Sequence, residues 1–102
     1  MRESPGRVFT LQQLAAALEK HRPALLFVAH AESSSGALQP LEQLGQLCRN
    51  TDTLLLVDSV AGAGGVPLFM DRWNIDCLYT GSQKCLGCTP GICPISFSEK
   101  AR

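Results

Sequence analysis

The sequence predicts an α/β fold in which helices flank a mostly parallel β-sheet. Residues 24–29 and 54–57 form two continuous apolar runs without polar alternation, a pattern typical of parallel strands covered on both faces. An amphipathic helical pattern precedes the first run, and a second one lies between the two runs. Because strand, helix and strand follow one another along the chain, a layered α/β architecture with parallel pairing is favoured.

The first helix is expected over residues 10–20. Thr10 is a suitable N-cap, and Gln13 follows it at the spacing of a capping box. The apolar residues of this segment share one helix face: Leu11, Leu14, Ala15 and Leu18. The sequence His-Arg-Pro at residues 21–23 is expected to end the helix, and the first strand follows directly.

The later elements follow from similar patterns. A polar loop at residues 32–36 leads to a second helix that is expected to begin near Pro40, since proline suits the first helical position. The apolar residues of this helix recur at helical spacing: Leu41, Leu44, Leu47 and Cys48. A glycine-rich loop at residues 62–65 follows the second strand, and further strands are expected over residues 77–80 and 92–97.

The charge balance excludes two classes of partner. The 102 residues include nine Lys or Arg and nine Asp or Glu, which gives a formal net charge of zero. Because the sequence has no cluster of basic residues, it predicts no positively charged patch that would bind nucleic acid or a membrane surface. Its apolar runs are far shorter than the roughly 18 residues that a membrane span needs. We therefore expect a soluble protein without a nucleic-acid or membrane partner.

The predicted helices are too few for the predicted sheet. Strands that are apolar on both faces need helices on both sides and neighbours at both edges. Two helical segments do not supply that cover. Residues 1–102 are therefore expected to form the middle of a larger domain.

The five cysteines are Cys48, Cys77, Cys85, Cys88 and Cys93. Their odd number, without an apolar secretory segment at the start of the chain, favours reduced thiols over a disulfide scaffold. Cys85 and Cys88 form one C-x-x-C pair, whereas a structural zinc site usually has two such pairs. A small metal-binding module is kept as a minor hypothesis.

Polar side chains follow the ends of three predicted strands. Ser33 follows the first, Asp58 closes the second, and Lys84 lies in the loop after the third. In an open parallel sheet the carboxyl ends of the strands form the ligand crevice, so a hydroxyl, a carboxylate and an amine can converge there. Asp58 either caps a turn or faces a cationic ligand, and the residues alone leave both roles open. Lys84 is likewise either a solvated surface charge or a functional amine. His30, at the end of the first strand, is expected to be a structural hydrogen-bonding residue.

Five short segments stand in a specific order between residues 10 and 100. They are ESSSG with LQP at residues 32–40, LLVDSV at 55–60, MDR at 70–72, ID at 75–76 and YTGSQK at 79–84. Together they resemble the alanine–glyoxylate (serine–pyruvate) aminotransferases, in particular the vertebrate enzymes. The resemblance implies the central part of the large pyridoxal-phosphate-binding domain of a fold type I enzyme, here over residues 1–102.

The resemblance also implies roles for five residues. Lys84 would form the Schiff base with the aldehyde of pyridoxal 5′-phosphate and carry the proton of the substrate α-carbon. Asp58 would pair with the pyridine nitrogen and keep it protonated, which makes the ring an electron sink. Val60 would press on one face of the ring, Ser33 would lie near its phenolic oxygen, and Gln83 near its phosphate. No metal site is implied.

The implied reaction moves the amino group of alanine (or serine) to glyoxylate, giving glycine and pyruvate (or hydroxypyruvate). Such enzymes are homodimers of peroxisomes or mitochondria whose active site is completed by the partner subunit. Gln83 argues against the related cysteine desulfurases, which typically carry histidine before the lysine. The family's usual Pro-Pro-Gly after the lysine loop is replaced here by Thr-Pro-Gly at residues 89–91. The alternative is a truncated, non-catalytic remnant that at most associates with a full-length enzyme.

Overall fold

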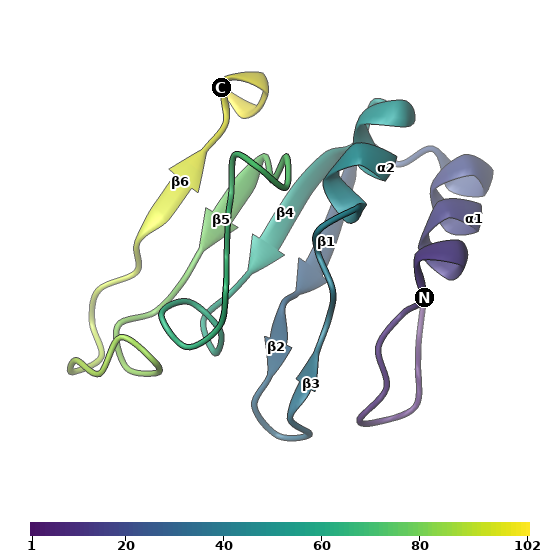
Figure 1. Cartoon of the computed structure of the whole chain (residues 1–102). Helices are drawn as coiled ribbons and strands as arrows, with labels where there is room; N and C mark the ends of the chain where they lie inside the picture. The colour runs from purple at the N-terminus through teal and green to yellow at the C-terminus, as the bar shows by residue number, and fades with distance from the viewer.

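A four-stranded sheet forms the frame of the computed structural model, which describes residues 1–102 (Figure 1). The strands lie side by side in the order β1 (Leu25–Ala29), β4 (Leu54–Asp58), β5 (Cys77–Tyr79) and β6 (Ile95–Phe97). The pairs β1–β4 and β4–β5 are parallel, and the β5–β6 pair is antiparallel. The sheet is therefore mostly parallel, as the sequence predicts.

Helix α1 (Leu11–His21) forms as its capping residues predict. The Thr10 hydroxyl accepts a hydrogen bond from the Gln13 N–H at 3.2 Å, and the Gln13 side chain accepts one from the Thr10 N–H at 2.8 Å. The helix ends at Arg22, which adopts a left-handed conformation with φ 41° and donates its N–H to the Leu18 carbonyl. Neither α1 nor α2 combines the length and apolar character that a membrane-crossing helix needs.

Helix α2 (Leu44–Asn50) begins later than predicted, so the expected start near Pro40 is wrong. The Gln39 N–H donates to the His30 carbonyl at 2.8 Å, which keeps the chain extended beside the end of β1. The Gln39 side chain also exchanges hydrogen bonds with the Phe9 backbone at 2.9 and 3.0 Å. These contacts fix the segment before Leu41, and the chain turns only from Leu41, whose carbonyl accepts the Leu44 N–H at 3.0 Å.

Two further predictions need correction. Part of the expected polar loop is a small antiparallel hairpin of β2 (Ala31–Glu32) and β3 (Ala37–Leu38). The last strand starts at Ile95 instead of residue 92, because Pro94 has no N–H to extend the ladder. Strands of two residues carry too little pattern to be recognised in the sequence.

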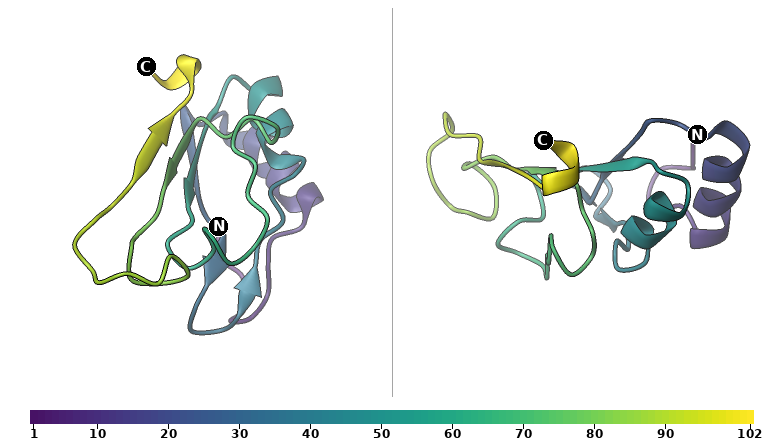
Figure 2. Two further views of the ribbon diagram at one scale, coloured as in Figure 1. Left: turned by 60° about the vertical axis from the view of Figure 1, so that its left-hand side comes forward. Right: turned by 90° about the horizontal axis from the view of Figure 1, so that it is seen from above.

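The core lies on one side of the sheet. Figure 2 shows α2 and the segment after β4 on this side, with α1 beside α2. The buried apolar residues come from both helices, β1, β4 and the segments before α2 and β5: Leu14, Leu18, Val28, Leu41, Leu44, Cys48, Leu55, Val57, Trp73 and Ile75. The opposite face is uncovered, and on it Phe27 is 53 % exposed and Ile95 56 % exposed. The two helices thus cover one face only, which agrees with the expectation that two helices do not supply cover for both faces.

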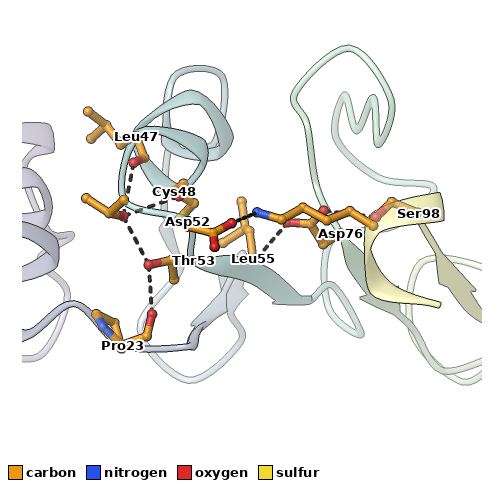
Figure 3. A network of polar contacts seen from close by, with 10 residues as sticks. Pro23, Leu47, Cys48, Asp52, Thr53, Leu55, Asp76 and Ser98 are labelled. Atoms are coloured by element: carbon orange, nitrogen blue, oxygen red, sulfur yellow. Dashed lines mark hydrogen bonds and ion pairs between the residues drawn. The ribbon is translucent and has the colours of Figure 1, made fainter.

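A polar network fastens the amino end of β4 (Figure 3). Buried Asp76 accepts hydrogen bonds from the Leu55 N–H and the Ser98 hydroxyl, both at 2.9 Å. Nearby, the Thr53 hydroxyl donates to the Pro23 carbonyl at 2.8 Å. This network lies at the end of the sheet opposite the carboxyl ends of β1, β4 and β5, so it supports the sheet away from the candidate site.

Candidate functional site

The carboxyl ends of the three parallel strands meet at one edge of the sheet. In Figure 1 the arrowheads of β1, β4 and β5 point the same way, toward the β2–β3 hairpin and the loops after β4 and β5. The residues singled out in the sequence all lie in or beside these segments. This arrangement is the expected ligand crevice of an open parallel sheet.

Asp58 is the last residue of β4, and its half-buried carboxylate lies on the uncovered face. One oxygen, Oδ1, accepts the Val60 N–H at 2.9 Å, so Asp58 does cap the turn that follows it. The other oxygen, Oδ2, accepts the Tyr79 hydroxyl at 2.7 Å. Each oxygen keeps acceptor capacity after these bonds, since a carboxylate has about four lone-pair positions. The turn-capping role is therefore compatible with a cationic ligand.

Lys84 lies in the exposed turn after β5. The two ion pairs of the structure join Lys100 to Asp52 and Arg102 to Glu99, so the Lys84 amine is unpaired. The pKa of Glu32 is lowered, chiefly by a hydrogen bond from the Ser34 N–H and further by the positive charge of Lys84. The Lys84 amine therefore has no competing ion-pair partner, and its neutral form can react with a carbonyl group.

The loop that carries Lys84 is fixed by its own backbone. The Ser82 hydroxyl donates to the Thr89 carbonyl at 2.6 Å, and the Ser82 carbonyl accepts the Cys88 N–H at 2.9 Å. The Lys84 carbonyl accepts the Gly87 N–H at 2.9 Å. These hydrogen bonds connect the two sides of the loop, so the backbone at Lys84 has a defined position.

The glycine-rich loop after β4 supports the Lys84 loop. The Cys85 thiol donates to the Ala61 carbonyl at 3.3 Å. A Cβ atom on Gly65 would lie 2.6 Å from the Cys85 sulfur, so a larger residue at position 65 would displace the Cys85 side chain. Gly65 therefore serves the close packing of the two loops.

Val60 and Gln83 come together above Gly81. A Cβ atom at Gly81 would lie 2.7 Å from the Gln83 side-chain oxygen and 3.3 Å from a Val60 methyl group. Ser33 is different, because it lies in the exposed turn of the β2–β3 hairpin and makes no hydrogen bond to the other four predicted residues. The structure thus brings Val60 and Gln83 together and leaves Ser33 at the rim.

Two features of the site were missed in the sequence. Tyr79, the partner of Asp58, is identified only by the β4–β5 register, which places the two residues opposite each other. The second feature is a hydrogen bond of 3.0 Å between the Ser59 hydroxyl and Nδ1 of buried His30, whose direction depends on the tautomer of the imidazole. Burial lowers the pKa of His30, and the negative charge of Glu42 partly opposes this shift. The structural role predicted for His30 is confirmed.

The cysteines do not form a metal centre. No group of three or more His, Cys, Asp or Glu side chains is placed to hold a metal ion. All five cysteines are unpaired, and Cys85, Cys88 and Cys93 are exposed. The hypothesis of a small metal-binding module therefore has no support in the geometry.

Comparison with known proteins points to one family. The aminotransferase class-V family profile matches residues 2–102. Alanine–glyoxylate aminotransferase of Rattus norvegicus is 54 % identical over 102 residues, which make up 100 % of this chain and 25 % of the rat protein. (S)-Ureidoglycine–glyoxylate transaminase of Bacillus subtilis is 37 % identical over 95 residues, or 93 % of this chain and 23 % of that protein. The chain thus spans about a quarter of the length of these relatives.

Solved structures give the same result. The crystal structure of an alanine–glyoxylate aminotransferase from Nostoc sp. matches with a TM-score of 0.92 and 56 % identity, over 94 % of this chain and 26 % of that one. The ureidoglycine–glyoxylate aminotransferase of Bacillus subtilis matches with a TM-score of 0.96 and 35 % identity, over 99 % of this chain and 26 % of that one. The predicted fold class, a mostly parallel sheet with flanking helices, is confirmed.

Proposed function

Because the chain belongs to the class-V aminotransferase family, we propose that residues 1–102 form part of the large pyridoxal-phosphate-binding domain of an alanine–glyoxylate aminotransferase. One observation carries this proposal. The half-buried Asp58 carboxylate ends β4, and the unpaired Lys84 amine lies in the loop after the neighbouring strand β5, at the same edge of the sheet. An acceptor for a cationic ring nitrogen and an amine for an aldehyde are the two groups that this cofactor needs most.

The side chains at this edge of the sheet fit pyridoxal phosphate. Both Asp58 oxygens accept one hydrogen bond from the protein, and each has room for a protonated nitrogen. The Lys84 amine makes no ion pair that would have to be broken. The Gln83 amide and a Val60 methyl group lie next to the same glycine, Gly81. A bound ligand would therefore find a polar and an apolar side chain close to each other.

The bound cofactor would supply an electron sink for the electrons of a substrate bond. Lys84 Nζ would hold the cofactor through its aldehyde. Once the substrate amine has taken its place on the cofactor, the freed Lys84 amine would carry the proton between the substrate α-carbon and the cofactor. Asp58 would keep the proton on the ring nitrogen. Val60 would cover one ring face, Gln83 would contact the phosphate, and Ser33 would contact the phenolic oxygen from the hairpin.

The substrates follow from the relatives. The alanine–glyoxylate and ureidoglycine–glyoxylate enzymes share glyoxylate in their names, which supports glyoxylate as the amino acceptor. We propose alanine or serine as the donor, so that glycine and pyruvate or hydroxypyruvate are the products. The family resemblance adds a homodimer, with a partner subunit that completes the site, in peroxisomes or mitochondria.

The uncovered face of the sheet supports a second candidate function. Leu25, Phe27, Ile95 and Phe97 expose apolar surface there. Such a face can associate with a full-length enzyme without completing an active site. In that case the chain is a non-catalytic remnant.

Reductive trapping distinguishes the two candidates. The chain is incubated with pyridoxal phosphate, treated with borohydride and digested, and mass spectrometry locates the attached pyridoxyl group. We expect the label on Lys84, and its loss to background in Lys84→Ala. Lys20→Ala is the matched control, since Lys20 is an exposed lysine of α1. Equal labelling of Lys20 and Lys84 would contradict the proposed role of Lys84 and favour the remnant.

A further inference from the structure

Tyr79 stands opposite Asp58 in the register of β4 and β5. Its hydroxyl oxygen lies 2.7 Å from Asp58 Oδ2. That distance is in the range of a strong hydrogen bond from a neutral O–H to a charged oxygen. The pair lies on the uncovered face of the sheet, beside the residues assigned to the cofactor.

The Asp58 carboxylate is held from two independent directions. The Val60 N–H binds Oδ1 from the turn after β4, and the Tyr79 hydroxyl binds Oδ2 from the neighbouring strand. With the Val60 bond alone, only Oδ1 would be held, and limited rotation of the carboxylate would still move Oδ2. The second bond removes this rotation, so the remaining lone pairs keep one orientation.

We propose that Tyr79 is the positioning residue of Asp58, and that its hydroxyl holds the carboxylate in the orientation that receives a cationic ring nitrogen. This inference rests on the proposed function of Asp58 as the partner of that nitrogen. Tyr79 itself touches neither the substrate nor the reacting atoms in this assignment. Tyr79 contributes to cofactor affinity because the Asp58 carboxylate already has the required orientation before the cofactor binds.

The protonation of Tyr79 is suited to this role. The hydrogen bond to Asp58, with smaller contributions from burial and from the negative charges of Asp58 and Cys93, raises the pKa of Tyr79 to about 12. The hydroxyl therefore remains a donor at every pH at which an aminotransferase works.

The composition of the chain makes the contact directly measurable. Tyr79 is the only tyrosine, so the ultraviolet absorbance of tyrosinate reports this residue alone. We expect a titration midpoint near 12 in the unmodified chain, recorded by stopped-flow pH jumps before alkaline unfolding proceeds. In Asp58→Asn the midpoint should fall toward the ordinary value of about 10. Asp71→Asn, which changes an exposed aspartate without a side-chain hydrogen bond, should leave it unchanged.

Cofactor binding tests the positioning itself. Tyr79→Phe should weaken pyridoxal phosphate binding about tenfold, since a hydrogen bond to a charged group is worth about that factor or more. It should also shift the pH dependence of the visible band of the bound cofactor. Borohydride trapping on Lys84 should persist at saturating cofactor, which separates a failure of this inference from a failure of the proposed function.

Two results would overturn the inference. One is a Tyr79 midpoint near the ordinary value that Asp58→Asn does not change. The other is a folded Tyr79→Phe variant that binds the cofactor with unchanged affinity and an unchanged pH profile. If Tyr79→Phe fails to fold, the tyrosinate titration of the unmodified chain and of Asp58→Asn still decides whether the contact exists.

Discussion

Replacing Asp76 with alanine should destabilise the fold more than any other single carboxylate deletion at this end of the sheet. Asp76 is 1 % exposed and precedes β5. Its N–H donates to the Leu55 carbonyl at 3.0 Å, and its Oδ2 accepts the Leu55 N–H at 2.9 Å. The side chain thereby continues the β4–β5 ladder one step beyond the strand, and Ser98 binds its second oxygen.

The expected magnitude follows from these two side-chain hydrogen bonds. Each is worth about 1.5 kcal/mol, and the buried Leu55 N–H would also lose its partner, so Asp76→Ala should cost about 3 kcal/mol. Asp76→Asn keeps an acceptor for Leu55 and should cost about 1 kcal/mol. With a urea m-value of about 1.5 kcal/mol/M, the alanine variant should lose about 2 M in the unfolding midpoint.

Urea unfolding can be followed through Trp73, which is the only tryptophan and is buried in the core. Asp71→Ala is the matched control, because the Asp71 side chain is exposed and makes no hydrogen bond; its effect should stay within about 0.5 kcal/mol. Equal midpoints for the Asp76 and Asp71 variants would refute the assignment of Asp76 as a structural carboxylate of the sheet.

Three further predictions concern the scaffold. Gly45→Ala should cost about 3 kcal/mol in urea unfolding, because its Cβ would collide with the Trp73 carbonyl oxygen. Gly36→Ala meets no atom within 4 Å and should cost only about 1 kcal/mol for its positive φ. Similar costs for the two variants would contradict the close packing of α2. Thr10→Ala should lower the free energy of unfolding by about 1 kcal/mol through loss of the α1 cap, and an unchanged urea midpoint would show that the capping box is dispensable. His30, whose pKa burial lowers from 6.5, contributes stability that is present above pH 6.5 and is lost as pH falls through its lower folded pKa. His30→Asn should therefore flatten the loss of stability between neutral pH and pH 5, and parallel pH profiles for the two proteins would refute this cause.

Much of the candidate site could be predicted from the sequence because its residues stand next to strong local patterns. Asp58 closes an apolar run that is typical of a buried strand, and Lys84 lies in a glycine-flanked loop after another expected strand. The place of both residues at the carboxyl edge follows from parallel pairing alone. Tyr79 could not be found in this way, because its contact with Asp58 depends on how two strands 21 residues apart align.

The sequence by itself determined the elements whose signal is local: the capped helix α1, the apolar strands β1 and β4, and their parallel order. Hydrophobic period and capping residues act within a few positions of the chain, so no distant contact is needed to recognise them. The tertiary structure decided the late start of α2, where Gln39 is bound by His30 and Phe9, and the support of the Lys84 loop by Gly65. It also decided that one face of the sheet is packed and the other uncovered. These features depend on contacts between segments far apart in the chain, and such contacts exist only once both segments have folded.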